Sequence, residues 1–235
     1  MDNWYKFYLN DLGLGIDEHK SELNSFDFSS VLLKTHSSSI YGVIGDDMQR
    51  IKIKWISINK DPFNPDTYYA YGKTNVKGNV CEFTGVLKIR TIRLFPKEEY
   101  DMPSSSKVNP EKIGVLFCDY NLVENKRQLH TGVFKGVSAS EFYIHKGKLF
   151  YNDLRASADD MSNNLFVGEW ISNSTKKSKI CFWGDYRVPN VSGFDCGAAV
   201  FSPCSKFDNK GWDDIDEAYN LNDQEALKRE LEEWW

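Results

Sequence analysis

The chain between residues 163 and 203 carries apolar and aromatic residues at strand-like spacing, with turn residues between the runs. It reads N-N-L-F-V-G-E-W, then K-I-C-F-W-G-D-Y-R-V-P, then F-D-C-G-A-A-V-F-S-P. Successive side chains of a strand point to opposite faces of a sheet, so this spacing is typical of half-buried strands. The aromatic content of 14% also favours sheet, because aromatic side chains pack well on a pleated surface. The pattern predicts a β-barrel or a β-sandwich.

About ten strands are expected along the chain, and no helical crossover pattern lies between them, so the sheet is expected to be antiparallel. Within residues 50–59 the apolar positions change phase between Trp55 and Ile56, which predicts a β-bulge or a strong bend. Residues 95–110 contain three prolines and three consecutive serines, as in a flexible loop. The predicted strands cover residues 40–44, 50–59, 67–73, 80–95, 113–120, 129–137, 141–145, 148–151, 165–172, 178–183 and 195–201.

The acidic charge is concentrated at the C-terminus. The net charge of −5 divides into −7 for residues 208–235 and +2 for residues 1–207. Asn222 is followed three residues later by Glu225, the spacing of a capping box at a helix start. The apolar residues that follow at helical spacing are Ala226, Leu227, Leu231, Trp234 and Trp235. Such a short helix is marginal alone, so we expect a β-barrel domain over 1–220 and an acidic amphipathic helix over 221–235 that packs on it.

The five cysteines are irregularly spaced and contain no C-x-x-C pair, which argues against a zinc knuckle. Cys81, Cys118 and Cys181 lie in apolar runs, where cysteine usually serves as a small buried hydrophobe. Cys196 and Cys204 could pair across a strand and a turn in an oxidising compartment. The pairing of these two cysteines stays open at this point.

Several classes of protein are not expected from this sequence. The basic clusters are short, whereas a nucleic-acid-binding protein normally shows a basic stripe. No run approaches 18 apolar residues, so no membrane span is expected. No signal-peptide pattern is visible at the N-terminus. The sequence as given is therefore expected to be cytoplasmic, or periplasmic or secreted if a leader was removed. No cofactor motif is present, and none is expected to bind.

The segment W-G-D-Y-R-V-P at residues 183–189 has the densest functional character. Trp183 and Tyr186 offer flat faces for a sugar, a peptide or an aromatic ligand, and Asp185 beside Arg187 can form an oriented ion pair. The alternative is a structural strand end, in which Asp185 and Arg187 pair while the aromatic side chains cap the barrel. The predicted ligand-binding residues are these four and Trp170 on the preceding strand: Trp170, Trp183, Asp185, Tyr186 and Arg187.

Two resemblances accompany this pattern. Phe166, Gly168 and Trp170 resemble the G-x-W signature of lipocalin-type barrels, although here it lies at three quarters of the chain. That resemblance implies a Trp that closes the base of a barrel under a ligand cavity, in a fold with a calycin-like look. The whole chain also resembles an uncharacterised family of bacterial β-rich proteins, which implies a single unit and no activity. The segments that carry this second resemblance are Gly72-Lys73, residues 79–85 (N-x-x-x-F-x-G), F-V-G-E-W, W-G-D-Y-R-V-P and the closing E-E-W-W.

Metal binding lacks a supporting motif. The four histidines are scattered and show neither H-x-H nor H-E-x-x-H spacing. Residues 153–164 are rich in Asp and Asn but lack the D-x-D-x-D-G order of a calcium loop. No metal site is therefore expected.

Catalysis has only weak candidates. Cys196 with His145 is conceivable as a nucleophile with its base, because such partners are distant in sequence. Asp185 with Asp195 or Glu169 is conceivable as the carboxylate pair of a glycosidase. Any β-rich protein offers such pairs, so we do not expect an enzyme, although a hydrolase is not excluded.

We therefore expect a non-catalytic binding protein for a small hydrophobic or aromatic ligand. It would use an aromatic-lined barrel cavity or a surface around Trp183, Tyr186 and Arg187. The alternative is a protein–protein interaction module, such as an inhibitor or a toxin-neutralising immunity protein. In that case the acidic tail would attract a basic partner, and the tail's apolar side chains would be the contact residues: Leu231, Trp234 and Trp235.

Overall fold

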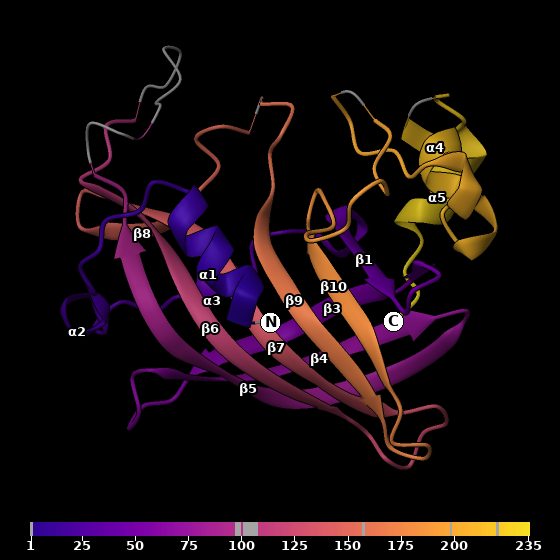
Figure 1. Ribbon diagram of the computed structural model, residues 1–235, viewed down its shortest axis with the longest axis horizontal. Coiled ribbons are helices and arrows are strands. Elements are labelled where there is room, and N and C mark those ends of the chain that lie inside the picture. The colour runs from indigo at the N-terminus through magenta and orange to yellow at the C-terminus, as the bar shows by residue number, and fades with distance from the viewer. Residues whose placement is uncertain (1, 97–99, 101–107, 157, 198, 220) are drawn as a thin grey trace.

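The computed structural model describes residues 2–96, 100, 108–156, 158–197, 199–219 and 221–235. One antiparallel sheet dominates it, with the strand order β2-β1-β10-β9-β7-β6-β5-β4-β3 and β8 beside β7. Figure 1 shows this sheet curled into a half-barrel, with helices near the C-terminus packed outside it. The predicted mainly β, antiparallel fold with a C-terminal helix is confirmed. The sequence left a barrel and a sandwich as alternatives, and the structure has a single curled sheet.

The elements have the following bounds. The strands are β1 (Ile40–Ile44), β2 (Gln49–Arg50), β3 (Lys52–Lys60), β4 (Thr67–Val76), β5 (Asn79–Leu94), β6 (Lys112–Glu124), β7 (Gly132–His145), β8 (Lys148–Tyr151), β9 (Asn163–Ser172) and β10 (Ser178–Asp185). The α-helices are α1 (Asp2–Asp11), α2 (Lys20–Leu23), α3 (Ser29–Leu32), α4 (Asp213–Tyr219) and α5 (Gln224–Leu231), and the 3₁₀ helices are η1 (Ser37–Ser39) and η2 (Ser205–Lys210).

The sheet curls because its long strands are bent at irregular positions. The register of β3 on β4 shifts between Trp55 and Ser57, which confirms the bulge predicted from the apolar pattern. The two edges of the sheet also meet at one corner. β2 pairs with β1 and is separated from β3 only by Ile51, whose N–H donates to the carbonyl of Gly42 at 3.0 Å. The half-barrel is therefore joined at that corner.

Aromatic side chains fill the interior of the half-barrel. The rings of Phe166 and Trp183 stack with their centroids 4.8 Å apart, and Tyr120 lies 5.4 Å from Trp183. Gly136 and Gly168 face each other on β7 and β9, and a Cβ at either position would collide with the Tyr120 hydroxyl. The glycine of the G-x-W pattern therefore makes room for an interior tyrosine.

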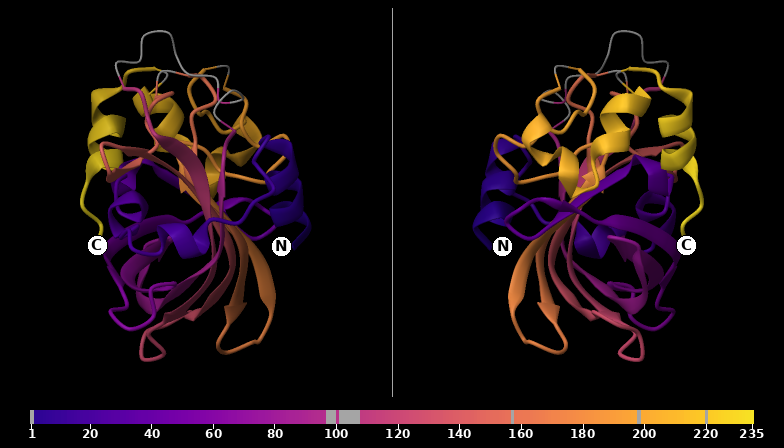
Figure 2. Two further views of the ribbon diagram at one scale, coloured as in Figure 1. Left: turned by 90° about the vertical axis from the view of Figure 1, so that its left-hand side faces the viewer. Right: turned by 90° about the vertical axis from the view of Figure 1, so that its right-hand side faces the viewer.

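Helices and loops cover the outer face of the sheet. α1 and the residues after it pack on Val115, Phe117 and Ala139, at the outer face of β6 and β7. The segment after β10 covers β1 and β10 with an apolar cluster that includes Phe194 and Trp212. Figure 2 shows the helices in the upper and middle parts of the molecule, while strands and their turns alone form its lower end. Among the described residues, no helix combines the length and hydropathy needed to cross a lipid bilayer.

The strand predicted over residues 195–201 was wrong, because the described residues of this range, 195–197 and 199–201, form no strand. Asp195 instead forms an isolated bridge with Pro203. The Asp195 carboxylate accepts hydrogen bonds from the backbone N–H groups of Gly197 (3.0 Å) and Ser202 (3.1 Å). A side chain that binds the backbone in this way offers it an alternative to a strand ladder, so the segment folds as a loop.

Three further differences concern the strands and the loop. The two strands predicted over 129–137 and 141–145 are one continuous strand, β7. The strand predicted over 178–183 extends to Asp185. The loop predicted over residues 95–110 lies partly outside the described residues, which omit 97–99 and 101–107.

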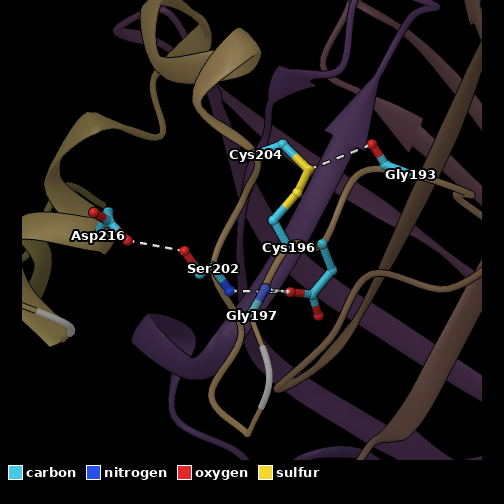
Figure 3. Close-up of a disulfide and its surroundings, with 7 residues drawn as sticks. Gly193, Cys196, Gly197, Ser202, Cys204 and Asp216 are labelled. Atoms are coloured by element: carbon cyan, nitrogen blue, oxygen red, sulfur yellow. Dashed lines mark hydrogen bonds between the residues drawn. A yellow bond between two sulfur atoms is a disulfide. The ribbon is translucent and has the colours of Figure 1, made fainter.

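Cys196 and Cys204 form a disulfide, with their Cα atoms 5.0 Å apart. The disulfide closes the base of the loop that Asp195 organises, and Figure 3 shows it beside Gly197 and Ser202 of that loop. The Ser202 hydroxyl donates to Asp216 of α4 at 2.8 Å, which connects this loop to the C-terminal helices. The other three cysteines are buried and free, as predicted: Cys81, Cys118 and Cys181.

The C-terminal helix α5 docks by a charge as well as by apolar contacts. Its N-cap is Asp223, one residue after the predicted Asn222, and the Asp223 carboxylate accepts from two backbone N–H groups at 2.9 Å. Glu230, 4% exposed, forms a bidentate salt bridge with Arg50 of β2, both contacts being 2.6 Å. Leu231, which we expected on the docking face, is 49% exposed. Ala226 on the expected docking face is fully buried, and Glu230, four residues later, lies on the same face. Helical spacing therefore predicted this face, but it did not predict the ion pair, because the two residues are 180 positions apart in sequence.

Candidate functional site

The predicted ligand-binding residues lie at opposite ends of the half-barrel. In the register of β9 and β10, Trp170 is opposite Lys179 and Asn163 is opposite Asp185. Seven residues separate Asn163 from Trp170, which corresponds to about 23 Å along a strand. Trp170 therefore cannot share a small-molecule site with Asp185, Tyr186 or Arg187.

Trp183 belongs to the interior and not to a surface. Its side chain is 1% exposed and packs against Phe166, Tyr120 and Phe134. The predicted surface around Trp183, Tyr186 and Arg187 thus lacks its tryptophan. Side chains along β10 alternate between the inner and the outer face of the sheet, and the bulge between Trp183 and Asp185 interrupts this alternation. The sequence alone therefore does not show which side chains near the bulge face inward.

Arg187 is bound to the protein itself. Its guanidinium forms an ion pair with Asp195 and donates to the backbone carbonyls of Asp159 and Ala199, the latter at 3.0 Å. The predicted ion pair with Asp185 is replaced by the one with Asp195. Tyr186, which is 39% exposed, remains on the surface beside it. With its donors directed at the chain, Arg187 holds the loop after β10 in place.

Asp185 lies in a buried polar cluster that ties together four segments of the chain. Its carboxylate accepts hydrogen bonds from Thr35 (2.7 Å), Tyr151 (3.0 Å) and Asn164 (2.9 Å). Burial raises the pKa of Asp185 to about 7, and the three hydrogen bonds oppose that rise. Because these donors come from β8, β9 and the loop before η1, the cluster closes this end of the half-barrel. We call it the closed end.

The opposite end, which we call the open end, contains a cavity of about 690 Å³. This volume lies within the range of small-molecule sites, about 300–1,000 Å³. The turns between β1 and β2, β4 and β5, and β6 and β7 form its mouth. Its apolar lining residues are Ile44, Ile51, Val76, Leu129, Phe134 and Trp170, and its polar ones are Asp47, Gln49, Thr74, Lys77, Asn79, Glu124, His130 and Lys179, with Gly78 at the tip of a turn.

Trp170 forms a wall of the cavity in a fixed orientation. Its indole Nε1–H donates to Glu124 at 2.9 Å. The indole lies directly over Gly132, where any Cβ would collide with the ring. Trp170 is only partly buried, and it is the one predicted ligand-binding residue that lines this cavity. The glycine and the glutamate together hold an aromatic face at the cavity wall.

Glu124 is the buried charge-bearing group of the open end. It is 4% exposed, and besides Trp170 its carboxylate accepts from the Thr74 hydroxyl and the Gly132 backbone N–H, both at 2.7 Å. Burial raises the pKa of Glu124, and these hydrogen bonds oppose the rise. Within the described ranges, no Lys or Arg side chain lies in salt-bridge distance of Glu124. A carboxyl group without a counter-ion therefore lines the cavity.

The sequence analysis missed Glu124, although a signal was present. Cys118, Tyr120 and Leu122 alternate along β6 and all are buried, and Glu124 continues the same phase. A glutamate on the inward face of a strand is unusual, because acidic side chains are almost never buried without a partner. That phase alone would have identified Glu124 as an interior carboxyl group.

The remaining sequence candidates are occupied or far apart. Cys196 is in the disulfide, so it carries no thiol for a nucleophile pair with His145. Glu169 pairs with Ile180, five residues along β10 from Asp185, and Asp195 is bound to Arg187. In the part of the chain that the structure describes, no group of three or more His, Cys, Asp or Glu side chains is placed to hold a metal ion.

The tail residues proposed for partner binding lie beside β3. The ring of Trp235 is 4.2 Å from the Lys54 ammonium and 6.3 Å from the His36 ring. Trp234 and Trp235 are both partly exposed, with ring centroids 5.6 Å apart. The tail therefore rests on the body and leaves part of each indole at the surface.

Comparison of the chain with protein-family models, curated proteins and solved structures finds no match. The candidate site is thus identified by its own geometry. It consists of the open-end cavity, the fixed Trp170 side chain and the buried Glu124 carboxyl group.

Proposed function

We propose that this is a non-catalytic binding protein that holds a small ligand with an apolar or aromatic body in the open-end cavity. The observation that carries the proposal is the orientation of Trp170, fixed by its hydrogen bond to Glu124 against a cavity of about 690 Å³. A rigid aromatic wall supplies contact area at low entropic cost, because its orientation is set before the ligand arrives.

The placement of apolar and polar side chains in the lining supports ligand binding. Six apolar side chains line the cavity together with eight polar ones, and of these Asp47, Lys77 and His130 belong to the turns at the mouth. Phe134 at the inner wall lies 6.0 Å from the buried Trp183, so the cavity ends on the aromatic interior of the half-barrel. A ligand in the cavity would therefore cover apolar surface continuous with the core.

Native mass spectrometry of the protein purified gently from its own host tests the proposal. We expect an added mass of a few hundred daltons, about that of a drug-sized ligand in a cavity of this volume. The variant Val76→Trp, which fills the cavity, should lose the added mass. Val86→Trp, on the outer face of β5 beside Tyr69, is the matched control and should retain it. An added mass that persists in Val76→Trp would contradict the proposal.

A second candidate is the protein-interaction module. The exposure of Leu231 (49%) and the partly exposed Trp234 and Trp235 support it, because such side chains serve as interface anchors. The acidic tail would speed the capture of a basic partner. Leu231→Asp leaves the salt bridge of Glu230 with Arg50 in place. Loss of a stoichiometric second protein from the native mass spectrum of this variant would favour the module over the cavity.

A further inference from the structure

The inner wall of the open-end cavity has more hydrogen-bond acceptor positions than donors to occupy them. Thr74, Trp170 and the Gly132 N–H, which are the donors around Glu124, all point their hydrogens at its carboxylate. A carboxylate has about four acceptor positions, so Glu124 retains capacity for one further donor. The wall therefore offers acceptor capacity and has no spare donor at this carboxylate.

Gln49 adds a second acceptor to the same cavity. Its side chain is 7% exposed, and its Nε2 donates to the backbone carbonyl of Lys210 at 2.8 Å. Its Oε1 atom is buried and receives no hydrogen bond from any described residue. A buried carbonyl oxygen without a donor costs free energy, which a ligand N–H would recover.

The aromatic side chains of the cavity favour the same kind of ligand. Trp is the side chain whose ring face attracts a cation most strongly, and Trp170 lines the cavity while its indole N–H is held on Glu124. A carboxylate beside an aromatic face is a suitable environment for an ammonium group. The same pair would repel an anionic group at that position.

Two lysines at the mouth carry a charge opposite to that of the Glu124 carboxylate, but they influence a ligand at the inner wall less. Lys77 and Lys179 are exposed, whereas Asp47 is paired with Lys210 at 3.0 Å. Exposed charges are screened over about 8 Å at physiological salt, while a buried charge acts through a lower dielectric. The buried carboxyl group therefore decides which end of a ligand reaches the inner wall.

We infer that the ligand is an organic cation, an ammonium group carried on an apolar or aromatic body, and that its nitrogen donates to the Glu124 carboxylate. This inference rests on the proposed function, because it names the chemical class that the same cavity would take. The apolar body lies along Trp170 and Phe134, and its far end reaches the lysines at the mouth.

Three probes of matched shape test the inference on the full-length protein: phenylbutylammonium, phenylbutanol and phenylpentanoate. Isothermal titration calorimetry gives the affinity of each. We expect the cation to bind about tenfold or more tightly than the alcohol and the carboxylate, as for a desolvated charge pair. Glu124→Gln keeps the size of the side chain and removes its charge, so the three affinities should then agree within about threefold.

Asp185→Asn is the matched control variant. It also replaces a buried carboxyl group that accepts three hydrogen bonds, but it lies at the closed end. It should leave the preference for the cation unchanged. Circular dichroism of both variants verifies that each is folded.

The outcomes separate the two proposals. Tight binding of the alcohol or the carboxylate would overturn the inference and still support a binding cavity. A cation preference that survives Glu124→Gln would also overturn the inference, because the carboxylate would then not be its source. If none of the three probes binds, both the binding function and the inference fail.

Discussion

The two ends of the half-barrel use the same chemical group in different surroundings. Asp185 at the closed end and Glu124 at the open end are both buried carboxyl groups that accept three hydrogen bonds. Burial raises the pKa of both. At the closed end the donors come from β8, β9 and the loop before η1, and at the open end they come from β4, β7 and β9, strands that also line a cavity.

The two ends of the half-barrel also differ in the elements that cover them. Asn164 at the closed end also donates to the carbonyl of Val31 in α3, at 3.1 Å, so a helix is fastened over the cluster. The open end has turns at its mouth, and within the described part of the chain no residue of a helix lines its cavity. The comparison teaches that a buried, hydrogen-bonded carboxyl group does not by itself mark a site. Access to a cavity distinguishes a binding group from one that joins segments.

The largest expected effect is a difference in stability between two alanine variants. Asp185→Ala leaves three buried donors without an acceptor and should cost about 3–5 kcal/mol of unfolding free energy. Glu124→Ala should cost only about 1–2 kcal/mol, because water from the cavity can solvate the freed donors. Urea unfolding of both variants measures the difference. Equal losses would mean that the two ends are equally sealed.

The free energy of unfolding should depend on pH through the buried Asp185 carboxyl group at the closed end. The folded pKa of Asp185 is about 7, against an ordinary value of 3.8. Between these values the unfolded chain is ionised while the folded protein keeps its proton, so the stability contributed by this group falls as pH rises. The fall amounts to at most about 4 kcal/mol. Urea unfolding of the native chain and of Asp185→Asn between pH 4 and pH 8 isolates it, and a difference that stays constant would refute it.

The disulfide should stabilise the covering next to the closed end and leave the open end unaffected. Cys196 and Cys204 are separated by 8 positions, and opening a loop of that length costs about 2–3 kcal/mol. Replacing both with serine should lower the urea midpoint accordingly. The affinity of the cavity for phenylbutylammonium should not change. A change in that affinity would show that the two regions are coupled.

The smallest expected effect concerns Trp170. The variant Trp170→Phe keeps an aromatic face and loses the indole N–H that donates to Glu124 at 2.9 Å. A single hydrogen bond of this kind is worth about 1–2 kcal/mol, so a modest loss of stability is expected. Trp183→Phe, in the buried interior, serves as the comparison and should not alter ligand affinity. If it does, the cavity continues into the core.

Much of the sheet could be predicted from the sequence because its apolar alternation is local. The strands β1 and β8 have the bounds expected from their turn residues, and the bulge after Trp55 follows from a change of phase. The error at residues 195–201 arose from Asp195, whose side chain binds the backbone of its own loop. Apolar residues at strand spacing do not reveal such a bond.

The candidate site was harder to predict because it depends on register and long-range contacts. Trp170 was identified, but the ends of β9 and β10 that separate it from Asp185 follow only from the pairing of the strands. The ion pair of Glu230 with Arg50 joins residues 180 positions apart. Helical spacing places Glu230 on the same face as Ala226, but it does not show which residue on the sheet pairs with it. Charges buried by tertiary contacts have no local pattern.

The most direct measurement follows the indole N–H signals in a proton–nitrogen correlation spectrum while phenylbutylammonium is added. The Trp170 signal is assigned from its absence in Trp170→Phe, and the Trp183 signal from its absence in Trp183→Phe. The open-end cavity predicts that the Trp170 indole and the Gly132 amide, both bonded to Glu124, shift together while the Trp183 indole stays in place. Shifts confined to the signals of Trp234, Trp235 or the residues around Asp185, with Trp170 unmoved, would contradict it.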